Sequence, residues 1–499
     1  MNAELQDGVA IPSERTASGP QSLREAWIAL AGLSAIFLFE MLDNSILNVA
    51  LPTIGRDLHA STTALQWVTS AYMVVFGGLM LVFGAIADRF GRRRVMLTGL
   101  VLLGLASLAT AFVSSPGQLI AVRATMGIAA AMTTPGSMAL AFRLFDDDRL
   151  RIRAITVIST VGLVGLAIGP TVGGFVLSVA PWQILLLINV PIAILAFIGV
   201  RLGIAADDPA ELHPDPVDSG GALLGTATIV FALIAPTFFV DKGVGSWMPW
   251  AASAAAIVGG GLFIWHERST RFPLIDLGLV ARPLVSSGLA YNAATGLAVA
   301  GLGYMATLLL QLDWGWSPAH ASIGMLPQVL VLLAGSAFVD PFIARVGQER
   351  AAVISASAVV SGLLVFGLMN RFGYLWVAVA LVLVSAGLRV VGVVAGMNVL
   401  QGLPEDRTTI GAALVDTSSE VTSGIGIAIT GTLLAAMFTG DITTSDWTVH
   451  QVGEFQNTLT LASLVLTGIA AALVSWGYIR AHLAAIDPVL VPTFGKEAA

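Results

Sequence analysis

The stretch WIALAGLSAIFLFEMLDNSILNVAL, Trp27 to Leu51, decides the class of this protein. A helix needs about 20 mostly apolar residues to cross the ~30 Å hydrocarbon core of a bilayer, and this run is long enough. Two carboxylates, Glu40 and Asp43, interrupt it three positions apart, so a helix places both on one side. Charged side chains inside a bilayer are costly and normally face a cavity or a partner. The stretch therefore predicts a membrane helix with a functional face.

The whole chain has the same apolar character. Of its 499 residues, 56% are hydrophobic and 11% are charged, with a mean hydropathy of +0.86, whereas soluble domains carry roughly 25% charged residues. The composition predicts an all-α integral membrane protein. There is no cysteine, no phosphate-binding G-x-x-x-x-G-K-[ST] motif, and every histidine lies in a loop or near a predicted helix end. We therefore expect no metal, no cofactor, no ATP use, no nucleic-acid binding and no enzymatic activity.

A window of about 20 residues finds fourteen apolar segments. Nineteen of the 24 Lys and Arg residues fall on the side of the membrane that holds the N-terminus, which predicts that both termini are cytoplasmic. The first 26 residues lack the apolar core of a signal peptide, so we expect the first helix to be retained. The predicted segments are 27–51, 63–87, 94–113, 117–141, 153–178, 183–203, 221–240, 247–266, 284–311, 320–341, 351–369, 374–400, 410–438 and 457–479.

Two short patterns occur once in each half of the chain. Residues 89–94 and 345–350 both fit R-x-G-x-x-R, and similar glycine- and methionine-containing stretches begin at Gly127 and Gly392. Such repeats predict two six-helix bundles with a binding site between them, and two inserted helices. The predicted units are an N-terminal segment 1–26, a bundle 27–203, an acidic linker 204–220, inserted helices 221–266, a bundle 284–479 and a tail 480–499.

Three motifs carry a family resemblance. GAIADRFGRRR, Gly84 to Arg94, is similar to the loop 2-3 signature of the major facilitator superfamily, with Ile86 where Leu is usual. GLAIGPTVGG, Gly165 to Gly174, matches the antiporter signature of its exporters, and LDNSILNVALP, Leu42 to Pro52, resembles the first-helix signature of its fourteen-helix drug:proton antiporters. The chain resembles this multidrug efflux family over its whole length. The resemblance implies a multi-pass cell-membrane transporter that works as a monomer and exchanges protons for small molecules.

The first two motifs also have a physical interpretation. In loop 2-3, Gly91 suits a tight turn, the arginines suit the anionic inner leaflet, and Asp88 can pair with them; a plain basic turn is the alternative. The resemblance implies a conformational latch formed by Gly84, Asp88, Arg89, Gly91, Arg92 and Arg94. In the second motif small residues allow close helix packing and a proline bends the helix, which suits an outer gate. Its residues are Gly165, Gly169, Pro170, Gly173 and Gly174.

Charged residues within the membrane segments are the candidate site. Arg123 is predicted to lie at a membrane depth comparable to that of Asp43. Arg389 lies at the same depth as Glu420 if the predicted helices 374–400 and 410–438 are antiparallel. Asp416 lies one turn from Glu420. The predicted membrane segments thus contain four acids but only two arginines. Burial favours the neutral, protonated form of a carboxylate that has no basic partner. We expect Asp43, Glu40, Arg123, Asp416, Glu420 and Arg389 to bind protons or substrate, while structural ion pairing is the alternative for each arginine.

These residues favour a proton-coupled exporter of lipophilic, cationic drugs or toxins, because one carboxylate can hold either a proton or a cation. An alternative is an exporter of an anionic metabolite, antibiotic or lipid bound through Arg123 and Arg389. A receptor or scaffold without transport is a third hypothesis. Five aromatic residues are candidates for contact with a cation, although most such residues only pack: Phe39, Trp67, Tyr72, Tyr291 and Tyr304.

Overall fold

The computed structural model describes residues 20–145, 147–207, 218–242, 245–271, 273–403, 408–439, 442 and 447–486. Most of the predicted N-terminal segment, the acidic linker and the tail lie outside these residues. The described residues form helices and no strands. Each of the fourteen predicted apolar segments is helical.

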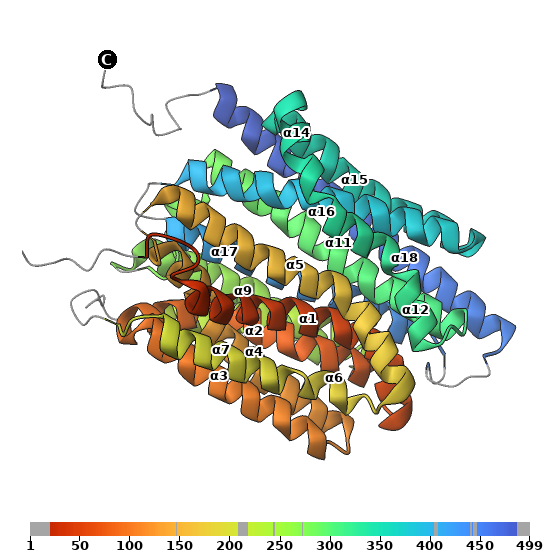
Figure 1. Ribbon diagram of the computed structural model, residues 1–499. Helices are drawn as coiled ribbons and strands as arrows, with labels where there is room; N and C mark the ends of the chain where they lie inside the picture. The colour runs from red at the N-terminus through yellow and green to blue at the C-terminus, as the bar shows by residue number, and fades with distance from the viewer. Residues whose placement is uncertain are drawn as a thin grey trace, which may run out of the picture.

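The first part of the chain contains nine α-helices and one 3₁₀ turn among the described residues. Figure 1 shows them as long rods that run roughly parallel to one another. Their bounds are α1 Trp27–Asp57, α2 Thr62–Phe90, α3 Arg92–Ala109, η1 Thr110–Phe112, α4 Pro116–Arg143, α5 Asp148–Val179, α6 Gln183–Leu187, α7 Asn189–Gly203, α8 Ser219–Lys242 and α9 Trp247–Ser269.

The second part repeats this arrangement with more interruptions. A short π-helical turn, η3, ends α11, and a 3₁₀ turn, η4, ends α15. The bounds are α10 Leu277–Val280, α11 Pro283–Leu308, η3 Leu309–Asp313, α12 Pro318–Gly324, α13 Leu326–Ala334, α14 Ser336–Val346, α15 Gln348–Met369, η4 Asn370–Phe372, α16 Tyr374–Gly402, α17 Thr408–Met437 and α18 Val449–Ile486.

Two predicted segments are not single helices. Segment 183–203 is split at Ile188 into α6 and α7, and segment 320–341 is broken twice. It is divided into α12, α13 and α14, with breaks at Met325 and Gly335. Pro327 lies in the first turn of α13, where its missing N–H leaves no hydrogen bond unmade. The apolar run alone could not reveal these breaks, because hydropathy does not register helix continuity.

Eleven helical stretches in the described part are long and apolar enough to cross a membrane. The other three predicted segments correspond to α4, to α8 and to the divided α12–α14. Figure 1 shows the start of α1 and the end of α18 at the same end of the molecule, which we call the proximal end. The opposite end, where α1 finishes at Asp57, is the distal end.

The two halves use equivalent helix neighbours. In the first half α1 packs on α5 and α7, and α3 packs on α4 and α7; in the second half α11 packs on α17 and α18, and α15 packs on α16 and α18. The α8–α9 pair lies against α2 and α17, one helix from each half. Thr226 of α8 donates a hydrogen bond of 2.7 Å to the carbonyl of Gly78 in α2. The site described next lies where the two halves meet.

Candidate functional site

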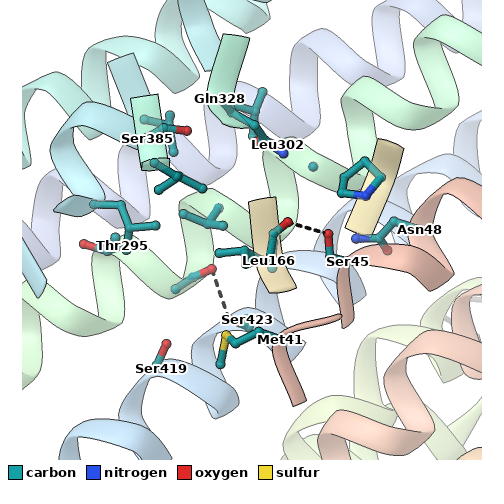
Figure 2. Close-up of a pocket in the computed structure, with 18 of the residues that line it drawn as sticks. Met41, Ser45, Asn48, Leu166, Thr295, Leu302, Gln328, Ser385, Ser419 and Ser423 are labelled. Atoms are coloured by element: carbon teal, nitrogen blue, oxygen red, sulfur yellow. Dashed lines mark hydrogen bonds between the residues drawn. The ribbon is translucent and has the colours of Figure 1, made fainter. Parts of the chain in front are cut away.

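A cavity of about 240 Å³ lies between the two halves. It is lined by side chains of α1, α2 and α5 from the first half and of α11, α13, α16 and α17 from the second (Figure 2). Most of the lining is aliphatic or methionine, with Ser, Thr, Asn and Gln side chains interspersed. Among the residues that the structure describes, Glu420 is the only ionisable one that lines it. This central cavity is therefore a mainly apolar chamber with a single carboxylate.

Glu420 lies on α17 and is 6% exposed, and its Oε2 atom has no hydrogen-bond partner in the described part of the structure. A buried polar atom without a partner costs free energy. Asp416, one turn earlier on α17, is partly buried. The sequence placed both acids on one helix face, and the structure brings Glu420 to the cavity wall.

Asp43 has a different environment. Its Oδ2 lies 2.5 Å from a terminal nitrogen of Arg123, and its Oδ1 accepts a hydrogen bond of 2.7 Å from Asn189. Both members of the ion pair are fully buried. Arg123 also donates to the carbonyl of Val68 and lies 4.5 Å over the ring of Tyr72. The expected Asp43–Arg123 proximity is present, but neither residue lines the cavity.

Glu40 has a different partner from Asp43 despite the three-residue spacing. Its Oε2 accepts a hydrogen bond of 2.9 Å from Thr134 of α4, and it is 2% exposed. The negative charges of Glu420 and Asp416 act on it across the boundary between the halves. Glu40, Asp416 and Glu420 therefore form a group of neighbouring acids, and none of them makes an ion pair with a described arginine or lysine.

Arg389 does not join the acids. Its side chain packs near Gly335, at the junction of α13 and α14, and its Nε is buried without a partner among the described residues. The structural ion pair of Arg389 with Asp416 or Glu420, which the sequence left as an alternative, is not formed among the described residues, because the position of a residue along its helix does not fix the direction of its side chain. The five aromatic candidates do not line the cavity either. Tyr72 instead packs on Arg123.

The loop between α2 and α3 is held by a residue that the motif does not contain. Asp88 pairs with Arg92 at 2.7 Å, and Gly91 has a φ of 103°, a conformation that suits glycine. Asp207, just after α7, accepts hydrogen bonds of 3.1 Å from the backbone N–H groups of Arg93 and Arg94. A carboxylate at a helix N-terminus is stabilising. Only the fold places Asp207 there.

The glycines of α5 allow two close contacts. A Cβ added at Gly169 would lie 2.7 Å from the Cβ of Ser45 on α1, and one added at Gly174 would lie 2.6 Å from the Cβ of Ser322 on α12. The latter contact joins the two halves. Gly165 and Gly173 approach Leu38 and Ile46 of α1 in the same way.

Polar contacts also close the distal end. Gln311 donates to the carbonyl of Val49 at 2.9 Å, and Gln66 donates to Thr432 at 3.0 Å and to the carbonyl of Ala428 at 3.2 Å. Each contact links one half to the other. These two glutamines thus tie the halves together at the distal end. Sequence reasoning missed them, because a glutamine near a helix end carries no distinctive pattern.

Comparison with known proteins gives a consistent result. The model of the Major Facilitator Superfamily matches residues 33–427. The multidrug efflux pump LfrA of Mycolicibacterium smegmatis is 29% identical, over 96% of this chain and 95% of its own. The puromycin resistance protein pur8 of Streptomyces alboniger is 29% identical over 97% of both chains. The cephamycin export protein CmcT of Amycolatopsis lactamdurans is 31% identical over 77% of this chain and 75% of its own.

Solved structures show the same fold at low identity. A bacterial homologue of the human lysosomal transporter Spinster has a TM-score of 0.64 at 14% identity, covering 95% of this chain and all of that one. The human organic anion transporter MFSD10 has a TM-score of 0.58 at 17% identity, covering 90% and 100%. Together with the apolar helices, these likenesses identify a multi-pass transporter of the cell membrane.

Proposed function

The chain belongs to the Major Facilitator Superfamily, and from this premise we propose that it is a proton-coupled exporter of lipophilic, cationic drugs. The proposal includes fourteen membrane helices, cytoplasmic termini, a distal end that faces outward and a functional monomer. The relatives named for drug resistance or export support the exporter part. The observation that carries the cationic part is the single unpartnered carboxylate of Glu420 in an otherwise uncharged cavity.

The cavity suits a lipophilic cation for two reasons. Its aliphatic and methionine side chains give apolar surface to the body of the cargo, and methionine adapts to different shapes. Glu420 supplies the one opposite charge, and in a low-dielectric site that charge attracts a cation more strongly than it would in water. A cavity of this kind favours cations of many shapes over one defined ligand.

Proton exchange follows from the group formed by Glu40, Asp416 and Glu420. Three neighbouring carboxylates without a basic partner among the described residues repel one another when ionised, so binding a proton to one of them relieves this repulsion. A cation bound at Glu420 compensates the negative charge of the group in place of a proton. It therefore favours release of that proton. Mutual exclusion of cation and proton then couples the two movements.

The anionic alternative has weaker support. It requires an arginine that meets the cargo, yet neither Arg123 nor Arg389 lines the central cavity. The charge of Arg123 is already neutralised by Asp43. Cation export therefore agrees better with the geometry.

The test uses purified protein in liposomes loaded with a pH-sensitive dye. Addition of tetraphenylphosphonium to the wild type is expected to produce coupled proton flux. The variant Glu420→Gln, which keeps the size of the side chain but removes its charge, is expected to lose both fluxes. Glu25→Gln, an exposed site that precedes α1, is the matched control and is expected to behave as the wild type. Wild-type exchange in Glu420→Gln would contradict the proposal.

A further inference from the structure

A second cavity, of about 270 Å³, lies inside the C-terminal half near its proximal end. It is lined by α11, α15, α16 and α18, is open on one side, and shares no described lining residue with the central cavity. Its polar lining includes Tyr291, Gln348, Glu349, Asn398 and Gln401. The proposed transport cycle uses none of these residues.

Tyr291 forms the buried part of this proximal pocket. The residue is 1% exposed, and its hydroxyl group has no hydrogen-bond partner among the described residues. A buried hydroxyl without a partner is unfavourable, which indicates that a ligand or solvent completes its bonding. The Tyr291 hydroxyl is therefore an observation that points to a ligand.

The amide side chains of the pocket are held in place. Gln348 donates a hydrogen bond of 2.8 Å to Oδ1 of Asn398, whose amide in turn lies 3.4 Å from the hydroxyl of Ser287. Asn398 is 6% exposed, so this arrangement is buried. With its nitrogen engaged by Asn398, Gln348 has its carbonyl oxygen left to accept a hydrogen bond.

Glu349 gives the pocket its charge. It is the only acid in the lining, and no lysine or arginine lines the pocket. His482 lies at the rim, with its Nδ1 3.7 Å from a Glu349 oxygen. The pocket therefore combines one negative charge with hydroxyl and amide oxygens that accept hydrogen bonds.

We propose that the proximal pocket binds the primary ammonium group of a small organic cation. An ammonium group has three N–H donors, and the pocket offers three kinds of acceptor: the Glu349 carboxylate, the Tyr291 hydroxyl and the amide oxygens of Gln348 and Gln401. The volume admits an alkylammonium of a few carbon atoms and is separate from the central cavity. This assignment does not depend on the proposed transport function.

The test titrates the full chain in detergent with n-butylammonium by calorimetry. Tetramethylammonium, which has the same charge but no N–H group, is the matched probe. The wild type is expected to bind n-butylammonium at least about fivefold more tightly than tetramethylammonium. Glu349→Gln is expected to weaken binding about fivefold, the equivalent of ~1 kcal/mol for a partly exposed charge pair. Tyr291→Phe is expected to weaken it by a smaller factor.

Two further variants separate this pocket from the central cavity. Ala481→Phe, on the α18 wall, fills the pocket without removing a charge and is expected to abolish binding. In the Glu420→Gln background, which lacks the carboxylate of the central cavity, Glu349→Gln is expected to weaken n-butylammonium binding by the same factor as in the wild-type background. The proposal is overturned if the wild type does not bind, if both ions bind equally, if Glu349→Gln and Ala481→Phe bind as the wild type, or if Glu420→Gln alone removes binding. Loss of transport in Glu420→Gln with intact n-butylammonium binding would support both proposals separately.

Discussion

The hydroxyl of Ser45 donates a hydrogen bond of 2.8 Å to the carbonyl oxygen of Leu166. Leu166 lies four residues before Pro170 in α5, so its carbonyl loses the usual helical donor because proline has no N–H. A residue of α1 thus replaces a hydrogen bond that the proline of α5 removes. Gly169 allows this approach, because any side chain there would collide with Ser45.

Ser45→Ala is expected to lower the thermal stability of the detergent-solubilised protein by about 1 kcal/mol, because the Leu166 carbonyl then has no donor. Ser423→Ala is the matched control: its hydroxyl donates at 3.1 Å to the carbonyl of Gly296 within α11, which lacks a proline four residues later. Thermal unfolding followed by fluorescence should show a larger loss for Ser45→Ala. An equal loss for both would argue against the special role of Pro170.

Closure of the distal end is expected to be reversible during transport. The Cβ of Gln66 lies 3.1 Å from the position of a Cβ on Gly431, so a separation of a few tenths of an ångström brings the pair into the roughly 3.5–4.5 Å range of a disulfide. The native chain has no cysteine, so a Gln66→Cys and Gly431→Cys pair can be cross-linked without a background reaction. Oxidation is expected to stop export in liposomes, and dithiothreitol to restore it. Full export by the oxidised pair, with each single cysteine as a control, would show that α2 and α17 need not separate there.

The buried Asp43–Arg123 pair is expected to act as a unit. Asp43→Asn leaves the guanidinium uncompensated, at a cost of about 3–5 kcal/mol. Adding Arg123→Gln removes that charge and is expected to recover most of the folded yield, measured by size-exclusion chromatography of a fluorescent fusion. Export should be absent from Asp43→Asn because little folded protein forms. If the double variant folds no better than Asp43→Asn, the two charges are not mainly compensating each other.

Glu40 is expected to affect proton coupling more than cargo binding, because it neighbours Glu420 but does not line the cavity. Glu40→Gln should lower the number of protons moved per cation, while the Kd for ethidium changes less than about threefold, or ~0.7 kcal/mol. Proton and ethidium fluxes measured together in liposomes give the ratio. Thr134→Val, which removes only the hydrogen bond to Glu40, is the control and should have a weaker effect. A large loss of ethidium affinity in Glu40→Gln would place this acid in direct contact with the cargo.

The sequence by itself determined the features that depend only on residues close together along the chain. Apolar runs of sufficient length determined where the helices lie, and the missing backbone donor at Pro170 and the turn at Gly91 follow from the properties of proline and glycine. The spacing of Asp416 and Glu420 placed both on one face of α17. These properties are local, so the order of residues is enough to specify them.

Only the tertiary structure decided which side chains meet. Glu40 and Asp43 are three residues apart, yet Arg123 and Asn189 hold Asp43 while Thr134 holds Glu40. Glu420 reaches the cavity and Arg389 does not, although the sequence predicts a similar membrane depth for both. Such outcomes depend on how helices far apart in sequence rotate and pack against one another. No pattern within a single helix contains that information.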